Sequence, residues 1–187
     1  VFPEIFTRSA TACGASLLAA ERVRDGGVVF SPAGGTHHGR PGRASGFCYL
    51  NDLVLCIGAL LDQGLTRILY LDIDAHHGDG VQDAYYTTNQ VLTISLHESG
   101  QFLFPGTGFV KEVGRDNGRG YSVNVPLLPY TGDDTYLWAF HQIVPPLMKA
   151  FKPDVLVTQL GIDSYHSDPL THLMLTSTGY IGLVTWF

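Results

Sequence analysis

The chain has 187 residues, which is long enough for one domain with a sizeable apolar core. Hydrophobic residues make up 45% of it and charged residues 15%, a balance that excludes intrinsic disorder and is typical of a buried α/β core. The formal net charge of −6 and the pI near 5.6 exclude the basic surface of a nucleic-acid-binding protein.

Cysteine usage and hydropathy predict where the chain resides. Cys13, Cys48 and Cys56 form no Cys-x-x-Cys pair, which is typical of buried thiols in a reducing compartment. No apolar run reaches the roughly 18 residues that span a bilayer, and no signal-peptide pattern is visible, so we expect a cytoplasmic protein without a membrane partner. The start at Val-Phe-Pro and the apolar end at 183–187 predict a single, partial domain over 1–187, truncated at both ends.

Apolar periodicity and turn residues predict alternating helices and strands, and hence an α/β fold with a parallel sheet. In chain order the predicted elements are a helix over 4–24, a strand over 28–30, a helix from 51 or 52 to about 63, a strand over 67–74, a helix over 81–86, strands over 91–97 and 121–127, a helix over 133–151, a strand over 155–160 and the start of a helix over 176–187. Two glycine-rich segments, 33–46 and 100–120, predict loops, and loops of that length in a compact domain are usually functional.

The segment 69–80 concentrates the polar chemistry of the chain. An apolar strand ends in three acids and two histidines within eight residues, 72–79. Burying so many titratable groups at a sheet edge is costly unless they are paired or bind a cation. Asp74 and His76 are two residues apart, so an extended strand end points both side chains to the same side. This spacing suits two ligands of one metal ion, although a lone Asp or His at a strand end is more often a cap.

Asp163 follows the last predicted strand and is the third candidate ligand. Because ligands of open α/β sheets bind at the carboxyl ends of the strands, we expect it near Asp74 and His76. An Asp-His-Asp set with open positions is the arrangement of a catalytic metal site and is compatible with Zn²⁺, Fe²⁺ or Co²⁺.

His37 and His38 lie on the first glycine-rich loop and are either structural or proton carriers beside the metal. Two acids, Asp72 and Asp79, remain after metal ligation. Each can hold one imidazole through Nδ1–H and raise its basicity. One metal, three ligands and two His–Asp pairs together predict metal-assisted hydrolysis of an amide.

Five segments of the chain resemble the histone deacetylase superfamily, and within it the bacterial and archaeal acetoin-utilisation-type deacetylases. They are PAGGTHHGRPGRASGFCYLND (32–52), YLDIDAHHGDGVQDAYYTT (70–88), SLHESGQFLFPGTG (95–108), YSVNVPL (121–127) and LGIDSYHSDPLTHLMLT (160–176). The resemblance implies a three-layer α/β/α arginase-deacetylase-like fold with a central parallel sheet. It also implies removal of acetyl or other acyl groups from a lysine peptide, an acetylpolyamine or a small acetylated amine.

The resemblance assigns roles that agree with the chemistry above. Asp74, His76 and Asp163 match the zinc ligands of the family. The catalytic positions are matched by the tandem histidines His37 and His38 and by their carboxylate partners Asp72 and Asp79.

Further positions follow from the resemblance only. The aromatic walls of the acyl-lysine tunnel are matched by Phe47 and Phe104, although Phe104 could equally be a core residue, and Gly46 matches the backbone carbonyl of the tunnel. Structural K⁺ or Na⁺ ions would be held at one site by Asp72, Asp74, His76, Ser95 and Leu96, and at a second site by the backbone carbonyls of Tyr85, Thr88, Val91 and Tyr121.

Two departures leave alternatives open. The transition-state tyrosine of the family lies in a glycine-rich loop that this sequence does not contain, and Tyr165 and Tyr180 have the wrong context to replace it. The chain could therefore be a non-catalytic metal-binding remnant, with unpaired sheet edges that favour homo-oligomers. An arginase-like ureohydrolase is a third alternative. That class has Asp-x-His-x-Asp, whereas Gly78 stands at the last position here and cannot ligate a second manganese.

Overall fold

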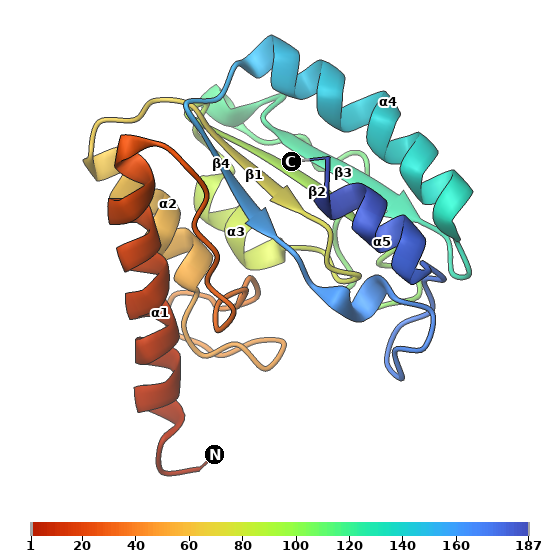
Figure 1. Cartoon of the computed structure of the whole chain (residues 1–187), viewed down its shortest axis with the longest axis horizontal. Helices are drawn as coiled ribbons and strands as arrows, with labels where there is room; N and C mark the ends of the chain where they lie inside the picture. The colour runs from red at the N-terminus through yellow and green to blue at the C-terminus, as the bar shows by residue number, and fades with distance from the viewer. Residues whose placement is uncertain (1, 187) are drawn as a thin grey trace.

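The computed structural model describes residues 2–186 and shows one parallel sheet between two layers of helices (Figure 1). The strand order is β3-β2-β1-β4, and every neighbouring pair is parallel. The strands are β1 (Ile68–Asp72), β2 (Val91–Glu98), β3 (Ser122–Leu127) and β4 (Val155–Gln159). All residues of β1 and β2 are buried, as expected for central strands covered on both faces.

The helices divide between the two faces of the sheet. One face is covered by α1 (Ile5–Arg22), α2 (Asp52–Asp62) and α3 (Asp79–Tyr85), and the other by α4 (Asp133–Phe151) and α5 (Ser177–Val184). Short 3₁₀ turns occupy Val23–Asp25, Asp116–Gly118 and Ile162–Ser164. No helix within residues 2–186 is long and apolar enough to cross a bilayer.

Strand β1 shows how the sheet divides the core. Ile68 and Tyr70 pack with residues of α1, α2 and α3, whereas Leu69 and Leu71 pack with residues of α4 and α5. Successive side chains of a strand point to opposite faces, so one buried strand contributes to both cores. The three-layer α/β/α arrangement is therefore confirmed.

Most predicted elements are confirmed to within a few residues, and their ends have the expected local causes. The Asn51 side chain accepts a hydrogen bond from the Val54 amide at 3.0 Å and caps α2, and Gly64 follows that helix with a φ of +94°. Thr176 caps α5 in the same way, through the amide of Gly179. Phe187, in the last predicted helix, lies outside the described residues.

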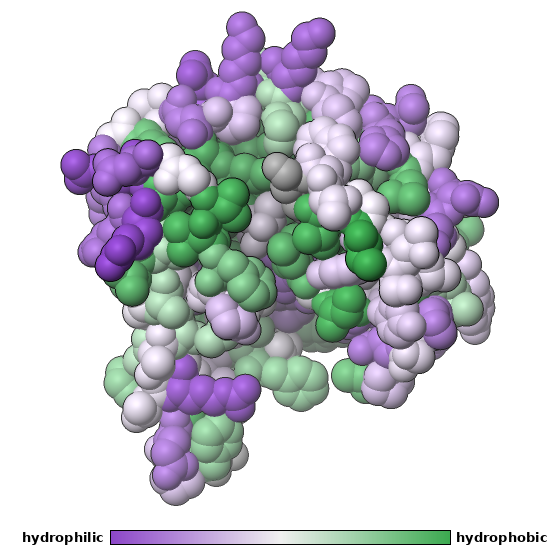
Figure 2. Space-filling model, in the orientation of Figure 1, coloured by the Kyte–Doolittle hydropathy of each residue, from purple (hydrophilic) through white to green (hydrophobic). Residues whose placement is uncertain are grey.

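The predicted strand over 28–30 is wrong. These residues form no regular structure, and Val28 and Phe30 are 98% and 75% exposed. A strand needs a partner for its backbone N–H and C=O groups, and the described residues place none beside this segment. Apolar side chains are visible at the surface between α1 and α5 (Figure 2).

The connections after β1 and β4 leave the sheet toward opposite faces. The chain passes from β1 into α3, on the α2 side, and from β4 into α5, on the α4 side. Because β1 and β4 are neighbours, their carboxyl ends mark the point where the strand order reverses. A crevice forms at such a point, and ligands of open α/β sheets bind there.

Candidate metal centre

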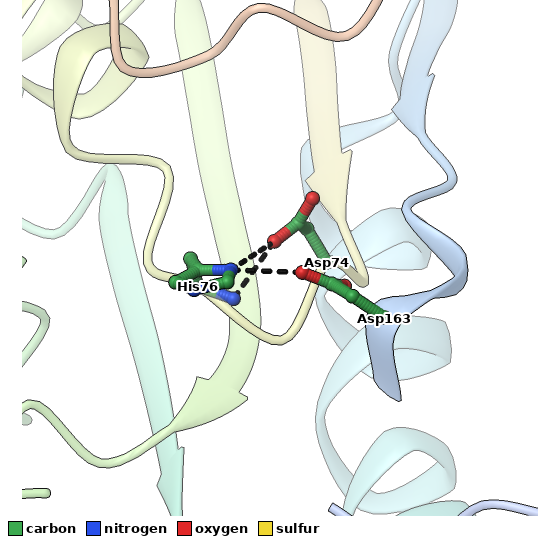
Figure 3. Close-up of side chains that lie close together, drawn as sticks. All are labelled: Asp74, His76 and Asp163. Carbon is green, nitrogen blue, oxygen red and sulfur yellow. Dashed lines mark hydrogen bonds and ion pairs between the residues drawn. The ribbon is translucent and has the colours of Figure 1, made fainter. Parts of the chain in front are cut away.

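Three side chains converge at the carboxyl ends of β1 and β4. Asp74 and His76 lie on the loop after β1, and Asp163 lies in the 3₁₀ turn after β4 (Figure 3). His76 Nδ1 is 3.1 Å from Asp74 Oδ1 and 2.8 Å from Asp163 Oδ2. The structure thus brings together the three predicted ligands, one imidazole nitrogen and two carboxylate oxygens, all within 4.8 Å of one another.

This donor set fits a divalent cation. Zn–N and Zn–O bonds of about 2.0–2.2 Å place neighbouring tetrahedral ligands roughly 3.3 Å apart, close to the spacing seen here. Burial and the nearby charge of Asp74 raise the pKa of Asp163. Burial would lower the pKa of His76, but the hydrogen bonds to Asp163 and Asp74 outweigh it and raise that pKa to about 10. A cation would replace the proton that balances these carboxylates, because a metal-binding imidazole is neutral.

Backbone amides and one side-chain amide hold the two carboxylates in place. The amides of Ala75 and His76 donate to Asp163 Oδ1 and Asp74 Oδ1, both at 2.8 Å. Gln159 Nε2 donates to Asp74 Oδ2 at 2.8 Å, and Gln159 Oε1 accepts from the Gly161 amide. Sequence reasoning missed Gln159. Its signal is an amide at the end of a strand that begins Val-Leu-Val, directly before Leu160-Gly161.

His37 forms the first predicted His–Asp pair. Its Nδ1 is 2.8 Å from Asp72 Oδ2, which also accepts from the Tyr70 hydroxyl at 2.6 Å. His37 Nε2 therefore faces the metal ligands, 3.8 Å from Asp74 Oδ1. Burial would lower the pKa of His37, but the charges of Asp72 and Asp74 outweigh it and raise that pKa to about 9.

His38 forms the second predicted pair in a different environment. Its Nδ1 is 2.6 Å from Asp79 Oδ1, and the other oxygen of Asp79 accepts from Arg40 at 2.6 Å. Burial lowers the pKa of His38 despite this carboxylate. Burial would raise the pKa of Asp79, but the hydrogen bonds from His38 and Arg40 lower it. The two neighbouring rings, 4.0 Å apart, thus differ in basicity.

The predicted tunnel residues have unequal positions. The Phe104 ring lies 5.1 Å from the His38 ring and 6.4 Å from the His76 ring, and it is about half exposed. A Cβ built on Gly46 would overlap the His38 ring, so the backbone at 46 lies directly against that ring. Phe47 has a φ of +63° and projects into solvent, 93% exposed. Gly46 and Phe104 thus adjoin the centre, and Phe47 lies at its outer rim.

The first predicted monovalent-cation set is compact. Ser95 pairs with Asp72 in the register of β1 and β2, and Asp72 is followed directly by the metal loop. The Leu96 carbonyl accepts from the Tyr136 hydroxyl at 3.2 Å, and the Ser95 hydroxyl lies 2.8 Å from His97 Nδ1. Ser95 and Leu96 therefore lie beside Asp72, at the start of the loop that carries the other two members of the set, Asp74 and His76.

The second predicted monovalent-cation set lies at the opposite end of the strands, where their amino ends are. Val91 begins β2 and Tyr121 immediately precedes β3, so both are at the amino ends of their strands. The carbonyls of Tyr85 and Tyr121 already accept the amides of Thr88 and Thr93, at 3.3 and 2.9 Å. A carbonyl has a second lone pair, so these contacts leave room for an ion.

Three positions bear on the alternatives. A Cβ built on Gly78 would overlap Asp72 Oδ2, so the backbone leaves no room for a further ligand at this position. The Tyr180 hydroxyl donates to the Leu160 carbonyl at 2.6 Å, and the Tyr165 ring packs 4.4 Å from the ring of His166.

Comparison with known proteins gives one consistent family. Residues 1–186 match the model of the histone deacetylase domain. The acetoin utilization protein AcuC of Staphylococcus aureus (strain COL) is 46% identical over 177 residues, 94% of this chain and 46% of that protein. AcuC of Bacillus subtilis (strain 168) is 43% identical over 182 residues, 96% of this chain and 47% of that protein.

Solved structures agree with the sequence comparisons. The crystal structure of an HDAC homolog from Aquifex aeolicus superposes with a TM-score of 0.94 at 40% identity, covering 98% of this chain and 50% of that chain. The chain thus spans about half the length of the relatives it matches. The match over nearly all of its residues, with the same three-layer fold, shows that the chain belongs to the histone deacetylase domain family.

Proposed function

We propose that this chain carries the catalytic centre of a zinc-dependent amide hydrolase that removes acetyl or other acyl groups from amines. The observation that carries the proposal is the Asp74–His76–Asp163 cluster, flanked by two buried His–Asp pairs. The AcuC relatives and the family match support a deacetylase. Zn²⁺ suits one nitrogen and two oxygen ligands, and Fe²⁺ or Co²⁺ would also fit.

The chain's own residues supply the proton transfers. When bound, a divalent cation supplies a Lewis acid for the amide carbonyl and a positive charge that opposes protonation of His37. His37 takes the proton of the attacking water at Nε2, while Asp72 holds its Nδ1–H. His37 then gives this proton from Nε2 to the departing amine, while neutral His38, with its Nδ1–H held by Asp79, orients the water through Nε2. Phe104 and Gly46 shield the His38 ring from water on the substrate side.

The test is acetate release from an acetyl-lysine peptide. It should be measured for this chain and for a chain of the full length of its relatives, with and without a chelator. We expect chelation and Asp163→Ala to abolish release, while Asp116→Ala, at a 70% exposed position, leaves it unchanged. Full activity in Asp163→Ala would contradict the proposal.

A non-catalytic metal-binding role of this chain is the second candidate. It is supported by the Tyr180 hydroxyl, which donates to the Leu160 carbonyl rather than toward the metal ligands. Loss of one oxyanion donor typically costs about 10²–10³ in kcat. Stoichiometric zinc without turnover in this chain, with turnover in the longer chain, would select this role.

An arginase-like ureohydrolase is the third candidate and is disfavoured. A side chain at Gly78 would overlap Asp72, so a second manganese lacks its ligand. Two manganese ions per chain in metal analysis would revive it.

The substrate classes we propose are acetylated lysine peptides, acetylpolyamines and small acetylated amines. A matching HDAC homolog, with a TM-score of 0.95, is complexed with SAHA, which supports small-molecule binding by this family. Parallel assays with one substrate from each class would rank the three classes by the rate of acyl release.

The three cysteines are free thiols, which supports a cytoplasmic location.

We also propose association through the outer strands. Among residues 2–186, β3 and β4 each have one strand neighbour, and apolar residues 28–30 are exposed. Unpaired edges pair readily with other chains. Sedimentation velocity should show concentration-dependent oligomers; a monomer at all concentrations would contradict this.

A further inference from the structure

The Asn51 side chain performs two tasks with its two ends. Its Oδ1 accepts from the Val54 amide and caps α2, at 3.0 Å. Its Nδ2 donates to the carbonyls of His37 and Gly39, both at 3.0 Å. These carbonyls flank His38, so one amide group holds the backbone on both sides of that residue.

The loop that carries the histidines depends on this support. Segment 34–39 contains three glycines and no helix or strand, so its own backbone restricts it little. A Cβ built on Gly39 would lie 2.8 Å from the Leu50 carbonyl carbon, which shows how closely the loop approaches the start of α2. Asp52 holds the preceding part, since its Oδ1 accepts from the Thr36 amide at 2.8 Å.

We propose that Asn51 is a positioning residue for His38, acting through the two carbonyls its amide holds. The position of the His38 ring depends on the position of its Cα. The contact of His38 Nδ1 with Asp79 Oδ1 at 2.6 Å therefore requires that the backbone at residue 38 be held in place. Without the two N–H groups of Asn51, the carbonyls of His37 and Gly39 lose this hydrogen-bond donor. Because the neighbouring His38 is buried, that loss is unfavourable. The role in catalysis rests on the proposed function; the role in geometry does not.

Gly80 gives a second way to disturb the same contact. It lies in the first turn of α3, and a Cβ there would overlap the His37 and Gly39 carbonyls and fall 2.8 Å from Asn51 Nδ2. Gly58, in α2, is the matched control, because its Cβ would meet only the Tyr85 hydroxyl, at 3.9 Å. Alanine has a higher helix propensity than glycine, and this effect is shared by Gly80→Ala and Gly58→Ala. A difference between the two variants therefore reflects the contact of position 80 with Asn51 and the two carbonyls.

The experiment compares Asn51→Asp, Gly80→Ala and Gly58→Ala in the full chain. Asp at 51 keeps the capping oxygen and removes the two donors, while Gly80→Ala disturbs the contact without adding charge. Imidazole NMR measures solvent exchange of the His38 Nδ1 proton, and thermal unfolding measures Tm. Where turnover is present, kcat and KM are measured separately.

We expect Asn51→Asp and Gly80→Ala to speed exchange of the His38 Nδ1 proton at least tenfold, and Gly58→Ala to leave it unchanged. Where turnover is measured, kcat should fall roughly tenfold to a hundredfold in the first two variants, with KM within about twofold. Wild-type exchange in both variants would overturn the inference, as would a change in Tm alone. Altered exchange in a chain without turnover would support the positioning role and count against the proposed function.

Discussion

At the scale of single residues, Asp74 divides its carboxylate between two tasks. Oδ1 faces His76 and the metal position, while Oδ2 accepts from Gln159. Gln159 Nε2 also donates to the Gly35 carbonyl at 3.2 Å, so one amide joins β4, the metal ligand and the histidine loop. Groups that orient metal ligands in this way commonly contribute tenfold or more to affinity, so Gln159 should matter for binding.

Gln159→Leu should weaken zinc binding by about 10–100-fold, because Asp74 loses the donor that fixes its orientation. Thr158→Val, at the adjacent position of β4, should leave affinity unchanged. Competition with a chromogenic chelator measures both. Equal affinity of Gln159→Leu and wild type would show that the backbone amides alone orient the carboxylates.

Gly78 is required by a steric contact. Gly78→Ala should lower the free energy of unfolding by about 1–3 kcal/mol, because its Cβ would overlap the buried Asp72 carboxylate. Gly14→Ala, in α1 with nothing within 4 Å, should raise that free energy by up to about 1 kcal/mol. Urea denaturation of both variants provides the measurement, and equal midpoints would refute the steric argument.

At the scale of elements, β2 is joined to the loop 100–120 through a buried imidazole. His97 Nε2–H donates to the Gly108 carbonyl at 2.9 Å, and Nδ1 accepts from the Ser95 hydroxyl at 2.8 Å. Both contacts use the neutral ring. Burial and, to a lesser extent, the neighbouring His77 lower the pKa of His97 to about 3.

This pKa makes the fold sensitive to acid. Below the unfolded-state pKa of about 6.5, the unfolded chain binds a proton at His97 that the folded chain does not bind until about pH 3. Stability should therefore fall as pH decreases through this window, by about 2 kcal/mol from this group between pH 7 and pH 5. The free energy of unfolding of His97→Gln should vary less between these two pH values. An identical pH dependence would show that His97 is not the responsible group.

At the scale of the whole molecule, the metal cluster joins two strand ends that are far apart in the chain. Asp163 follows β4 and lies 87 residues after His76, which follows β1. A ligand that binds only the folded chain stabilises it, because unfolding separates the donors. Binding of the cation should therefore stabilise the pairing of β1 with β4, and with it the folded chain.

Zinc at a hundredfold excess over its Kd should raise the free energy of unfolding by about 2.7 kcal/mol. For a chain of this size that corresponds to an increase in Tm of several degrees. Chelation should reverse the increase, and Asp163→Ala should show none. An unchanged Tm with bound zinc would mean that the unfolded chain binds the metal equally well.

Much of the fold and of the site could be read from local patterns. The apolar runs, the cap at Asn51 and the glycine-rich loops predicted nearly every helix and strand, since these signals act over a few residues. The segment 28–30 failed because strand formation depends on a partner, which a local pattern does not encode. Gln159 escaped notice, and Asn51 was predicted only as the start of a helix, because their contacts with distant segments are not encoded in a local pattern.

By itself, the sequence determined which chemical groups stand at the strand ends and that they resemble those of one family. Alternation, spacing and residue type are local properties, and they sufficed to select Asp74, His76, Asp163 and the tandem histidines. Tertiary structure decided that these groups meet: β1 and β4 are neighbours, and their loops diverge at the reversal of strand order. It also decided that His37 and His38 differ in basicity, because burial and charge depend on surroundings that only the folded chain creates.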